Sequence, residues 1–433
     1  MEKKAIPKMG AIIIAVVIVV AVVAGIVVYY YTAAPPAAPA TQEVLRIGII
    51  YPKTGIYSSI GPQCLDGILM AIEDYGPVLG AKPEVYIRDS GTEMSKAVAA
   101  AKELITQYHV HIIIGAINTP INNAIATVCD EYRVPFLYPS GGSIFMSGIG
   151  KDLPLPDWTV KANPHPFMFY TWLNSIQRAY ACIEVAKMYG TRWYFIASDY
   201  DHGREAVGYA KLVLQEKFGD EFVNVGESWP VQGEVDYTSA IAKAMAAKPD
   251  VVYVCVPGRF VQFQKQAHEA GLDKVAHIHW SYTEDPSIWA LGEVGYGVTA
   301  ITDYTVVNPE VPQAWDFAKR FHEKYGYWPG WPSAPAYAGT IVFLMAVDKA
   351  GSLDPVKIMR AVEGISNPNS ITGQPYYIRA CDHKSIQPLY IVEWVKSDNP
   401  DVPDHWKIIG KCPNPEDAHL PDEYCAGYDK MSY

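Results

Sequence analysis

Residues 45–62 read LRIGIIYPKTGIYSSIGP, in which a β-rich run is followed by a turn of small residues and a proline. The run Leu45–Tyr51 has the length and composition of a buried strand, and apolar residues recur at helical spacing in Pro62–Tyr75. A proline at the first helical position is well tolerated, because its missing N–H would have no helical partner there. If this strand–turn–helix unit repeats, it predicts a parallel sheet with covering helices.

The unit does repeat, in two blocks. The strands predicted in the first block are Leu45–Tyr51, Glu84–Asp89, His111–Gly115 and Pro135–Tyr138. Those predicted in the second block are Trp193–Ala197, Asn224–Glu227, Val251–Val256 and Val298–Thr305. Helices are expected at Pro62–Tyr75, Ser95–Tyr108, Ile121–Tyr132, Arg204–Phe218, Tyr237–Ala247, Phe260–Ala270, Gln313–Tyr325 and Ala336–Ala350. The predicted fold class is therefore α/β, with two doubly wound parallel-sheet lobes.

Three hinge crossings are expected to join the lobes, near Lys161–Pro166, His277–Tyr282 and Ser366–Gly373. The third is needed because the closing strands Tyr376–Arg379 and Leu389–Trp394 must join a sheet. Lobe 1 then comprises residues 45–163 and 281–370, and lobe 2 comprises residues 164–280 and 371–398. Residues 399–433 are expected to form an irregular C-terminal extension. Such crossings let two rigid lobes hinge over a cleft.

The N-terminus has a different composition. Three lysines precede an uninterrupted apolar run, Ala11–Val28, and three tyrosines follow it. A helix of that length can cross a hydrocarbon core of roughly 30 Å with the lysines on the cytoplasmic side. Residues 1–10 are therefore predicted to be cytoplasmic, residues 11–31 to be a transmembrane anchor or signal, and residues 32–44 to be an Ala- and Pro-rich linker. The remainder is expected outside the membrane.

Two other interpretations of the N-terminus stay open. A secretory signal peptide is one, although its apolar region is usually shorter. The other comes from Lys8-Met9-Gly10 directly before the apolar run, which resembles archaeal pilin-like signals that are cut before that run. In that case the run remains on the mature protein.

Composition and motifs narrow the function. A formal net charge of -11 argues against nucleic-acid binding, which needs clustered Lys and Arg. The chain contains no P-loop, no GxGxxG opening a helix, no GxSxG or HExxH, and no paired-cysteine zinc pattern. The pairs His109/His111 and His277/His279 lack further ligands for a metal. No cofactor and no metal are therefore expected, and an enzyme is the least favoured class.

The seven cysteines allow disulfides in an exported protein, and the odd number leaves at least one unpaired. Cys64, Cys129, Cys182 and Cys255 fall inside predicted helices or strands and are expected to be buried. Cys412 and Cys425 flank a polar, Pro-rich segment and are the candidate disulfide. Cys381 paired with either of them is the alternative.

Three loops of the first block follow predicted strands, where open parallel sheets bind ligands. The first contains Tyr57 and Ser58, and Tyr57 is suited to cover an apolar group. In the second, Thr119 has the place of a helix N-cap, where a hydroxyl and free N–H groups favour a carboxylate. The third, Ser140-Gly141-Gly142, exposes backbone donors beside a hydroxyl.

These loops resemble the leucine/isoleucine/valine-binding protein family, the type I periplasmic binding proteins that feed ABC importers. The resemblance continues through Asp199–Gly203, Val235–Thr238, Lys248–Val252, Gln266–Gly271, Phe321–Gly326 and Gly373–Arg379. No single motif is diagnostic, but the ordered series spans roughly Leu45 to Val395. The resemblance implies that Thr119 and the backbone near Ser140 and Gly142 meet the ligand's carboxylate-like end, and that Tyr57 covers its apolar part.

In the second lobe the resemblance implies ligand contacts at His202, where the family usually has a tyrosine, and at Tyr237. Two departures suggest a different ligand. Gly142 lacks the hydroxyl that amino-acid binders often supply, and Arg259 holds the position expected to give a carboxylate to the ligand's ammonium. A neutral amide, a second carboxylate or an aromatic acid is then favoured over an α-amino acid. The alternative is that Arg259 points to solvent at a helix start.

The sequence therefore predicts an extracytoplasmic solute receptor, tethered by its N-terminal helix, that hinges over a small amino acid, amide or organic acid. Its expected partners are that small-molecule solute and the ABC permease complex in the membrane. Because the hinge requires only that the closed state bind ligand better than the open one, no catalysis is needed. A membrane-tethered sensor with the same fold is the alternative, and an α/β enzyme is less favoured.

Overall fold

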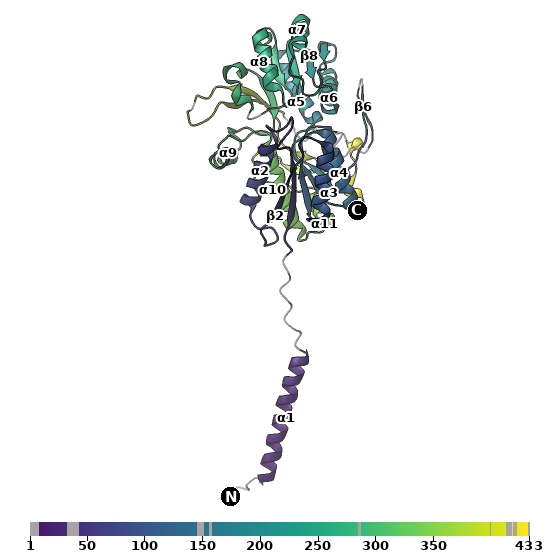
Figure 1. Cartoon of the computed structure of the whole chain (residues 1–433), viewed down its shortest axis with the longest axis vertical. Coiled ribbons are helices and arrows are strands. Elements are labelled where there is room, and N and C mark those ends of the chain that lie inside the picture. The colour runs from purple at the N-terminus through teal and green to yellow at the C-terminus, as the bar shows by residue number, and fades with distance from the viewer. Residues whose placement is uncertain are drawn as a thin grey trace. The chain divides into compact units, whose positions relative to one another are not determined.

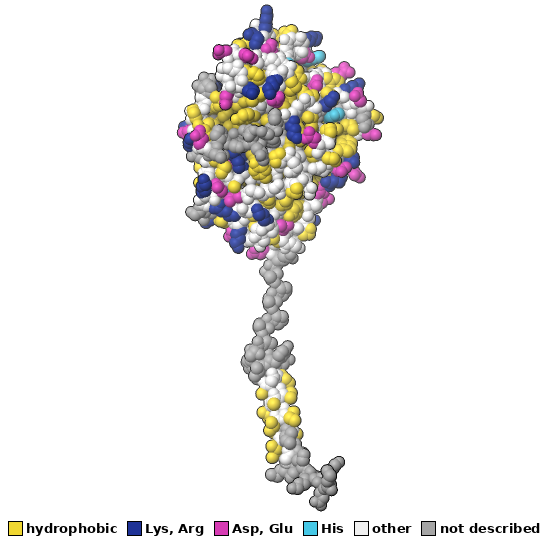
Figure 2. All heavy atoms as spheres, turned by 180° about the vertical axis from the view of Figure 1, so that it is seen from behind, with side chains coloured by type: hydrophobic (Ala, Val, Ile, Leu, Met, Phe, Trp, Pro, Cys, Tyr) yellow, Lys and Arg dark blue, Asp and Glu magenta, His cyan; other side chains and the backbone are white. Residues whose placement is uncertain are grey.

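The computed structural model describes residues 8–32, 43–144, 151–155, 158–284, 287–398, 400–412, 418 and 422–431. The chain divides into two units, Met1–Glu43 and Val44–Tyr433. The first unit holds α1 (Lys8–Thr32), and the side chains described along α1 are apolar and exposed, Val17 and Val20 among them (Figures 1 and 2). Within the described part of the chain, no helix has the length and apolarity needed to span a membrane. Most of the predicted cytoplasmic segment and linker lies outside the described residues.

The second unit is built on two sheets. The first sheet has the strand order β2-β1-β3-β4-β7 and is parallel throughout. Its strands are β1 (Arg46–Tyr51), β2 (Glu84–Asp89), β3 (Ile112–Gly115), β4 (Phe136–Tyr138) and β7 (Met168–Tyr170). Its helices are α2 (Gly61–Tyr75), α3 (Met94–Thr106), α4 (Thr119–Tyr132), α10 (Ser333–Ala350) and α11 (Pro355–Val362).

The central strands of this sheet are buried on both faces, as is usual for a parallel sheet. From Ile47 onward every residue of β1 is buried, as expected of a strand covered by helices on either side. Figure 1 shows α2 with α10 on one side of this sheet and α3 with α4 on the other. Gly67 lets α2 approach α10 closely, since a Cβ there would lie 2.2 Å from the carbonyl oxygen of Ser333.

The second sheet has the order β16-β15-β12-β11-β10-β8-β9. The strands β8 (Arg192–Ala197), β9 (Val223–Ser228), β10 (Val251–Cys255), β11 (His277–Trp280) and β12 (Thr299–Thr302) run parallel. The last two, β15 (Tyr390–Val395) and β16 (His405–Lys411), are antiparallel. Helices α5 (Ser175–Tyr189), α6 (Asp201–Phe218), α7 (Thr238–Ala247) and α8 (Phe260–Ala270) surround this sheet (Figure 1).

Smaller elements complete the unit. Helix α9 (Pro312–Tyr325) is joined to α2 by an ion pair between Arg320 and Asp74. The hairpins are β5 (Leu153–Leu155) with β6 (Trp158–Val160), and β13 (Tyr377–Ile378) with β14 (Ser385–Ile386). Basic and acidic side chains are interspersed over the face of this unit shown in Figure 2.

The sheets confirm the predicted α/β class but depart from the predicted lobe ranges. The chain passes between the sheets after β7, after β12 and after β14. Consequently β7 belongs to the first sheet although it follows residue 163, and β12 belongs to the second although it falls within 281–370. The segment expected as a crossing at His277–Tyr282 instead begins with β11, in the middle of the second sheet.

Among the strands that the sequence did not predict, β11 and β16 were missed for identifiable reasons. The two histidines of β11 interrupt its apolar pattern, but both rings contact the hydroxyl of Thr299, at 2.7 Å from His277 and 2.9 Å from His279. Burial lowers the pKa of His277 to about 4, so its ring is neutral in the folded chain. Strand β16 lies in the region expected to be an irregular extension, and it is an edge strand in which only Trp406 is buried.

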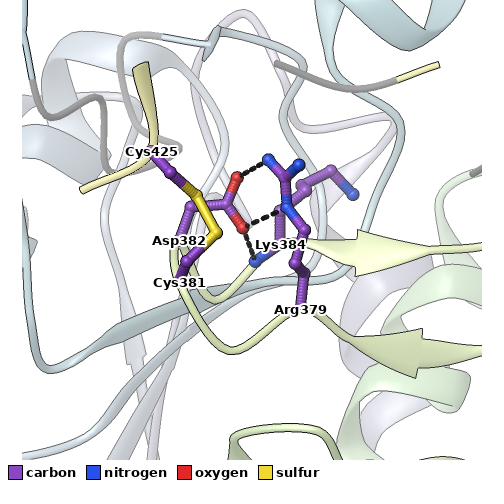
Figure 3. Close-up of a disulfide and its surroundings, with 5 residues drawn as sticks. All are labelled: Arg379, Cys381, Asp382, Lys384 and Cys425. Carbon is purple, nitrogen blue, oxygen red and sulfur yellow. Dashed lines mark hydrogen bonds and ion pairs between the residues drawn. A yellow bond between two sulfur atoms is a disulfide. The ribbon is translucent and has the colours of Figure 1, made fainter. Parts of the chain in front are cut away.

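The disulfide joins Cys381 to Cys425, with 5.8 Å between their Cα atoms, so the Cys412–Cys425 candidate was wrong and its alternative is correct (Figure 3). Cys412 is buried outside this disulfide, and its backbone N–H donates to the carbonyl of Leu389, beside β15. Cys425 lies instead against the turn of the β13–β14 hairpin, where Gly427 N–H donates to the carbonyl of Cys381. Within the same turn, Arg379 forms an ion pair with Asp382. The cysteines Cys64, Cys129, Cys182 and Cys255 are buried and free, as predicted.

Candidate functional site

Strand order determines where a ligand can approach this unit. In the first sheet the order reverses between β1 and β3, and in the second between β8 and β10. Loops that leave the carboxyl ends of strands at such switch points form crevices. The loops that follow β1, β3 and β4 meet those that follow β8, β10 and β11 at one cleft.

Fifteen residues line the cleft: Tyr57, Ile60, Ile117, Asn118, Thr119, Tyr138, Ser140, Gly141, Gly142, Trp172, Tyr200, His202, Pro257, Tyr282 and Trp331. Its volume is about 30 Å³, room for one or two water molecules. The unit has two halves, each built on one of the two sheets, and they are therefore nearly closed over the site.

Tyr57 connects the two halves. Its ring is buried, and its hydroxyl accepts a hydrogen bond at 2.9 Å from Gln232, which lies between β9 and α7 of the second half. Burial raises the pKa of Tyr57 to about 12, so the phenol is neutral and can also donate. A predicted cleft residue is thus also part of the contact that holds the halves together.

The turn after β3 presents amide and hydroxyl groups. Helix α4 begins at Thr119, and the N-cap is Asn118 with a φ of 89°, so Thr119 is not the cap that the sequence suggested. The Asn118 side-chain oxygen is buried without a hydrogen-bond partner among the described residues. Thr119 is buried too and lines the cleft, which places a hydroxyl at the start of the helix.

The loop after β4 is shaped by close packing. The Ser140 hydroxyl contacts the Tyr51 hydroxyl at 2.9 Å and donates to the carbonyl of Ala116 at 3.1 Å, so it is largely used inside the fold. A Cβ on Gly141 would lie 1.4 Å from the Tyr138 hydroxyl, and one on Gly142 would lie 1.9 Å from a guanidinium nitrogen of Arg178. Both glycines are therefore required by their neighbours.

Aromatic rings form much of the remaining wall. Trp172 and Trp331 stack with their centroids 4.7 Å apart. The ring of Tyr282 meets both of them edge-on, at 5.2 Å and 5.0 Å. Flat apolar faces of this kind suit a planar organic solute.

Arg178 and His202 supply polar groups beside these aromatic rings. Arg178, on α5, is completely buried, and its guanidinium lies 3.3 Å from a ring nitrogen of His202. Burial, and then the charge of Arg178, lowers the pKa of His202 well below its usual value. The imidazole is therefore neutral and has one donor and one acceptor.

The structure brings six of the nine predicted residues into the cleft lining: Tyr57, Thr119, Ser140, Gly141, Gly142 and His202. Ser58 is exposed outside the lining. Tyr237 is buried away from the cleft, and its hydroxyl donates to the carbonyl of Glu234. Arg259 is half-buried and donates to the carbonyls of Gly233 and Gly258, also outside the lining.

Sequence reasoning missed the aromatic wall and Arg178. A signal for Arg178 exists in Asn174-Ser175-Ile176-Gln177, where Asn174 and Gln177 form a capping box that starts α5. Recognising it places Arg178 one turn into that helix. Trp172 and Trp331 lie in segments between elements, and nothing local to them indicates a shared site.

Comparisons with known proteins agree with this architecture. The family model for periplasmic binding proteins matches residues 44–399. A Leu/Ile/Val-binding protein homolog of Brucella suis biovar 1 is 23% identical over 351 residues, covering 78% of this chain and 86% of the relative.

Two solved structures illustrate the likeness of fold. A leucine-binding protein from Thermotoga maritima superimposes with a TM-score of 0.70 at 23% identity, covering 86% of this chain and 100% of that one. An ABC-transporter solute-binding protein from Rhodopseudomonas palustris, in complex with 3,4-dihydroxybenzoic acid, gives a TM-score of 0.76 at 24% identity. It covers 85% of this chain and 97% of that one.

Proposed function

Because this chain belongs to the periplasmic binding protein family, we propose that it is the solute receptor of an ABC importer and captures a small organic solute in the cleft. The observation that carries the proposal is the joining of switch-point loops from both sheets at that cleft. A site divided between two halves is suited to closing on a ligand, since each half alone offers an incomplete set of contacts.

Capture by closure follows from the size of the cleft. A volume of about 30 Å³ admits no organic solute, so the halves must separate before one can enter. We propose that the two sheets with their helices move as rigid lobes about the segments that connect them. The hydrogen bond from Gln232 to Tyr57 would form on closure, and a solute that favours the closed state shifts the population towards it.

A planar aromatic acid or amide is the ligand class that the wall supports best. Trp172, Tyr282 and Trp331 offer ring faces, while Thr119 and Asn118 add polar groups to the same lining. The Rhodopseudomonas palustris protein of similar fold is complexed with an aromatic acid, which supports the same class. An aliphatic amino acid remains the competing ligand, as in the Thermotoga maritima protein.

The receptor is proposed to work outside the cytoplasm, as its family does, with an ABC permease as its membrane partner. We also propose that Ala11–Val28 anchors it, an inference that rests on the apolar sequence of this run and the lysines before it. Mass spectrometry of the mature N-terminus tests the anchor. A mature chain that starts beyond Tyr31 contradicts it.

The test of function is a thermal-shift screen of the full-length chain in detergent against amino acids, amides and aromatic acids. A receptor is expected to melt at a higher temperature with its solute, because binding to the folded state stabilises it. NMR of the same solution should recover the solute unchanged. Turnover of the solute would contradict a receptor, and a flat melting temperature across the screen would contradict this ligand range.

A further inference from the structure

Arg178 is a buried cation whose hydrogen bonds are incomplete. Its side chain is 0% exposed, and its Nε and Nη1 atoms have no hydrogen-bond partner among the described residues. Burying an ion without partners is costly, so buried arginines are usually paired with carboxylates. Arg320, at the surface, shows the usual arrangement, with one nitrogen 2.8 Å and 2.7 Å from the two oxygens of Asp74.

The guanidinium lies directly behind the wall of the cleft. It sits over the rings of Trp172 and Tyr282, 4.9 Å and 5.3 Å from their centroids. Its Nη2 donates to the carbonyl of Gly142 at 3.2 Å and lies 3.3 Å from His202. All four of these neighbours line the cleft. Any charge on Arg178 therefore acts on a bound solute across a single layer of side chains and backbone.

The nearby carboxylates are already engaged elsewhere. Glu205 accepts hydrogen bonds from Ser143 and Ser175 and from the backbone N–H of Ile144. Glu284 accepts one from the N–H of Gly258, on the side of the cleft near Tyr57. These groups moderate the positive charge at Arg178, but they do not occupy its two free nitrogens.

Two further buried groups lie within electrostatic range. Burial raises the pKa of Asp303 to about 7, so it is substantially protonated near neutral pH. Lys384 is buried as well, and burial lowers its pKa well below the usual value. Neither supplies a full negative charge opposite Arg178. Arg178 is therefore held behind the cleft wall with no carboxylate on its Nε or Nη1 among the described residues.

His202 extends this chemistry into the cleft. Since its ring is neutral, one nitrogen can accept from Arg178, and the other then carries a hydrogen that can be donated to a solute. Gly142 completes the arrangement, because any Cβ there would collide with Arg178. The absence of a side chain at Gly142 therefore allows the Arg178 cation to lie against the wall of the cleft.

We propose that Arg178, acting through His202 and the Gly142 loop, makes the cleft select a carboxylate over its neutral carboxamide isostere. The inference rests on the proposed function, since it requires the cleft to be the solute site, and it assigns the charge of the solute. In a poorly hydrated site a cation attracts an anion strongly, whereas it offers a neutral amide little.

The experiment compares isosteric pairs by isothermal titration calorimetry on the full-length chain in detergent. The pairs are benzoate with benzamide, 3,4-dihydroxybenzoate with its amide, and 4-methylpentanoate with its amide. The wild-type protein should bind the acid of a pair about 30-fold or more tightly than the amide, the range for a buried charge pair. This ratio needs no variant, so it stands even if substitutions at Arg178 prevent folding.

Substitutions test whether the acid-to-amide affinity ratio depends on Arg178. Arg178→Gln should reduce the acid-to-amide ratio to about 3-fold or less, while Arg178→Lys, which keeps the charge, should retain a clear acid preference. Arg259→Gln tests the arginine that the sequence favoured, and Arg320→Gln is a surface control; both should keep the wild-type ratio. A merely structural role for Arg178 would weaken acid and amide alike.

The outcomes separate the inference from the proposed function. If the wild-type protein binds amides as tightly as acids, or if a folded Arg178→Gln protein keeps the wild-type ratio, the charge assignment is overturned and the receptor remains. If the protein binds none of these acids and amides and no amino acid either, the proposed function fails, and the inference fails with it.

Discussion

Removal of the Cys381–Cys425 disulfide should destabilise the globular unit by up to about 4 kcal/mol. The bond spans 44 residues, a loop that contains β14 and the two antiparallel strands β15 and β16. Cross-linking a loop of that length removes chain entropy from the unfolded state worth about 4 kcal/mol at 25 °C. The tail keeps other contacts, including the hydrogen bond from Arg360 to the carbonyl of Tyr428, so the folded state of the variant should survive.

The assay is urea unfolding of the full-length chain, followed by tryptophan fluorescence under non-reducing conditions. The double variant Cys381→Ser/Cys425→Ser should unfold at a midpoint lower by about 1 M or more, given the slopes usual for urea. Cys412→Ala is the matched control, because it also replaces a buried cysteine but leaves the Cys381–Cys425 disulfide in place. Its midpoint should shift much less than that of the double variant.

Two results would refute the reasoning. A double variant that unfolds at the wild-type midpoint would show that the cross-link adds nothing through the unfolded state. A non-reducing peptide map in which Cys412 is bonded, together with a large shift for Cys412→Ala, would show that the pairing itself is wrong.

Three substitutions probe the cleft and its surroundings. Gly142→Ala should abolish solute binding and lower the melting temperature, because its Cβ would lie 1.9 Å from Arg178; unchanged calorimetric affinity would contradict the tight packing. Tyr57→Phe removes the bond from Gln232 and should weaken solute binding about 3- to 10-fold, the worth of one hydrogen bond; an unaltered Kd would show that the bond does not support closure. Burial raises the pKa of Asp303 to about 7, so its contribution to stability is present below about pH 4 and is lost as the pH rises through 7. Asp303→Asn should therefore gain stability relative to wild type between pH 5 and pH 8 in urea unfolding, and a pH-independent difference would contradict that burial cost.

The sequence could predict those parts of the fold that depend on local residue patterns. Leu45–Tyr51 is apolar apart from Arg46 and is followed by a turn and a proline, and β1 and α2 form there. The loops at Thr119 and at Ser140 follow predicted strands in the same way, so their place in the cleft could be anticipated. Local periodicity and turn chemistry are sufficient for such elements.

The elements and site residues that the sequence did not predict depend on tertiary contacts. The strand β11 tolerates His279 in the interior because Thr299, on the neighbouring strand, is a hydrogen-bond partner that no local pattern reveals. The disulfide depends on which cysteine approaches the β13–β14 turn, a matter of spatial distance. Arg178 was missed because an arginine in a helix usually faces solvent, and its burial results from packing against Trp172 and Tyr282.

Arg178 also bears on why closure should depend on the solute. Closing the cleft to about 30 Å³ excludes bulk water from the vicinity of a cation that has two nitrogens without a hydrogen-bond partner in the described part of the chain. Without an anion, the closed state carries that electrostatic cost, and the hydrogen bond from Gln232 to Tyr57 offsets little of it. A carboxylate relieves the cost in the closed state far more than in a hydrated open one, and a ligand shifts a two-state equilibrium only through such a difference. The unsatisfied guanidinium would then serve selectivity and closure together, since the solute that it prefers is also the one that makes the closed state favourable.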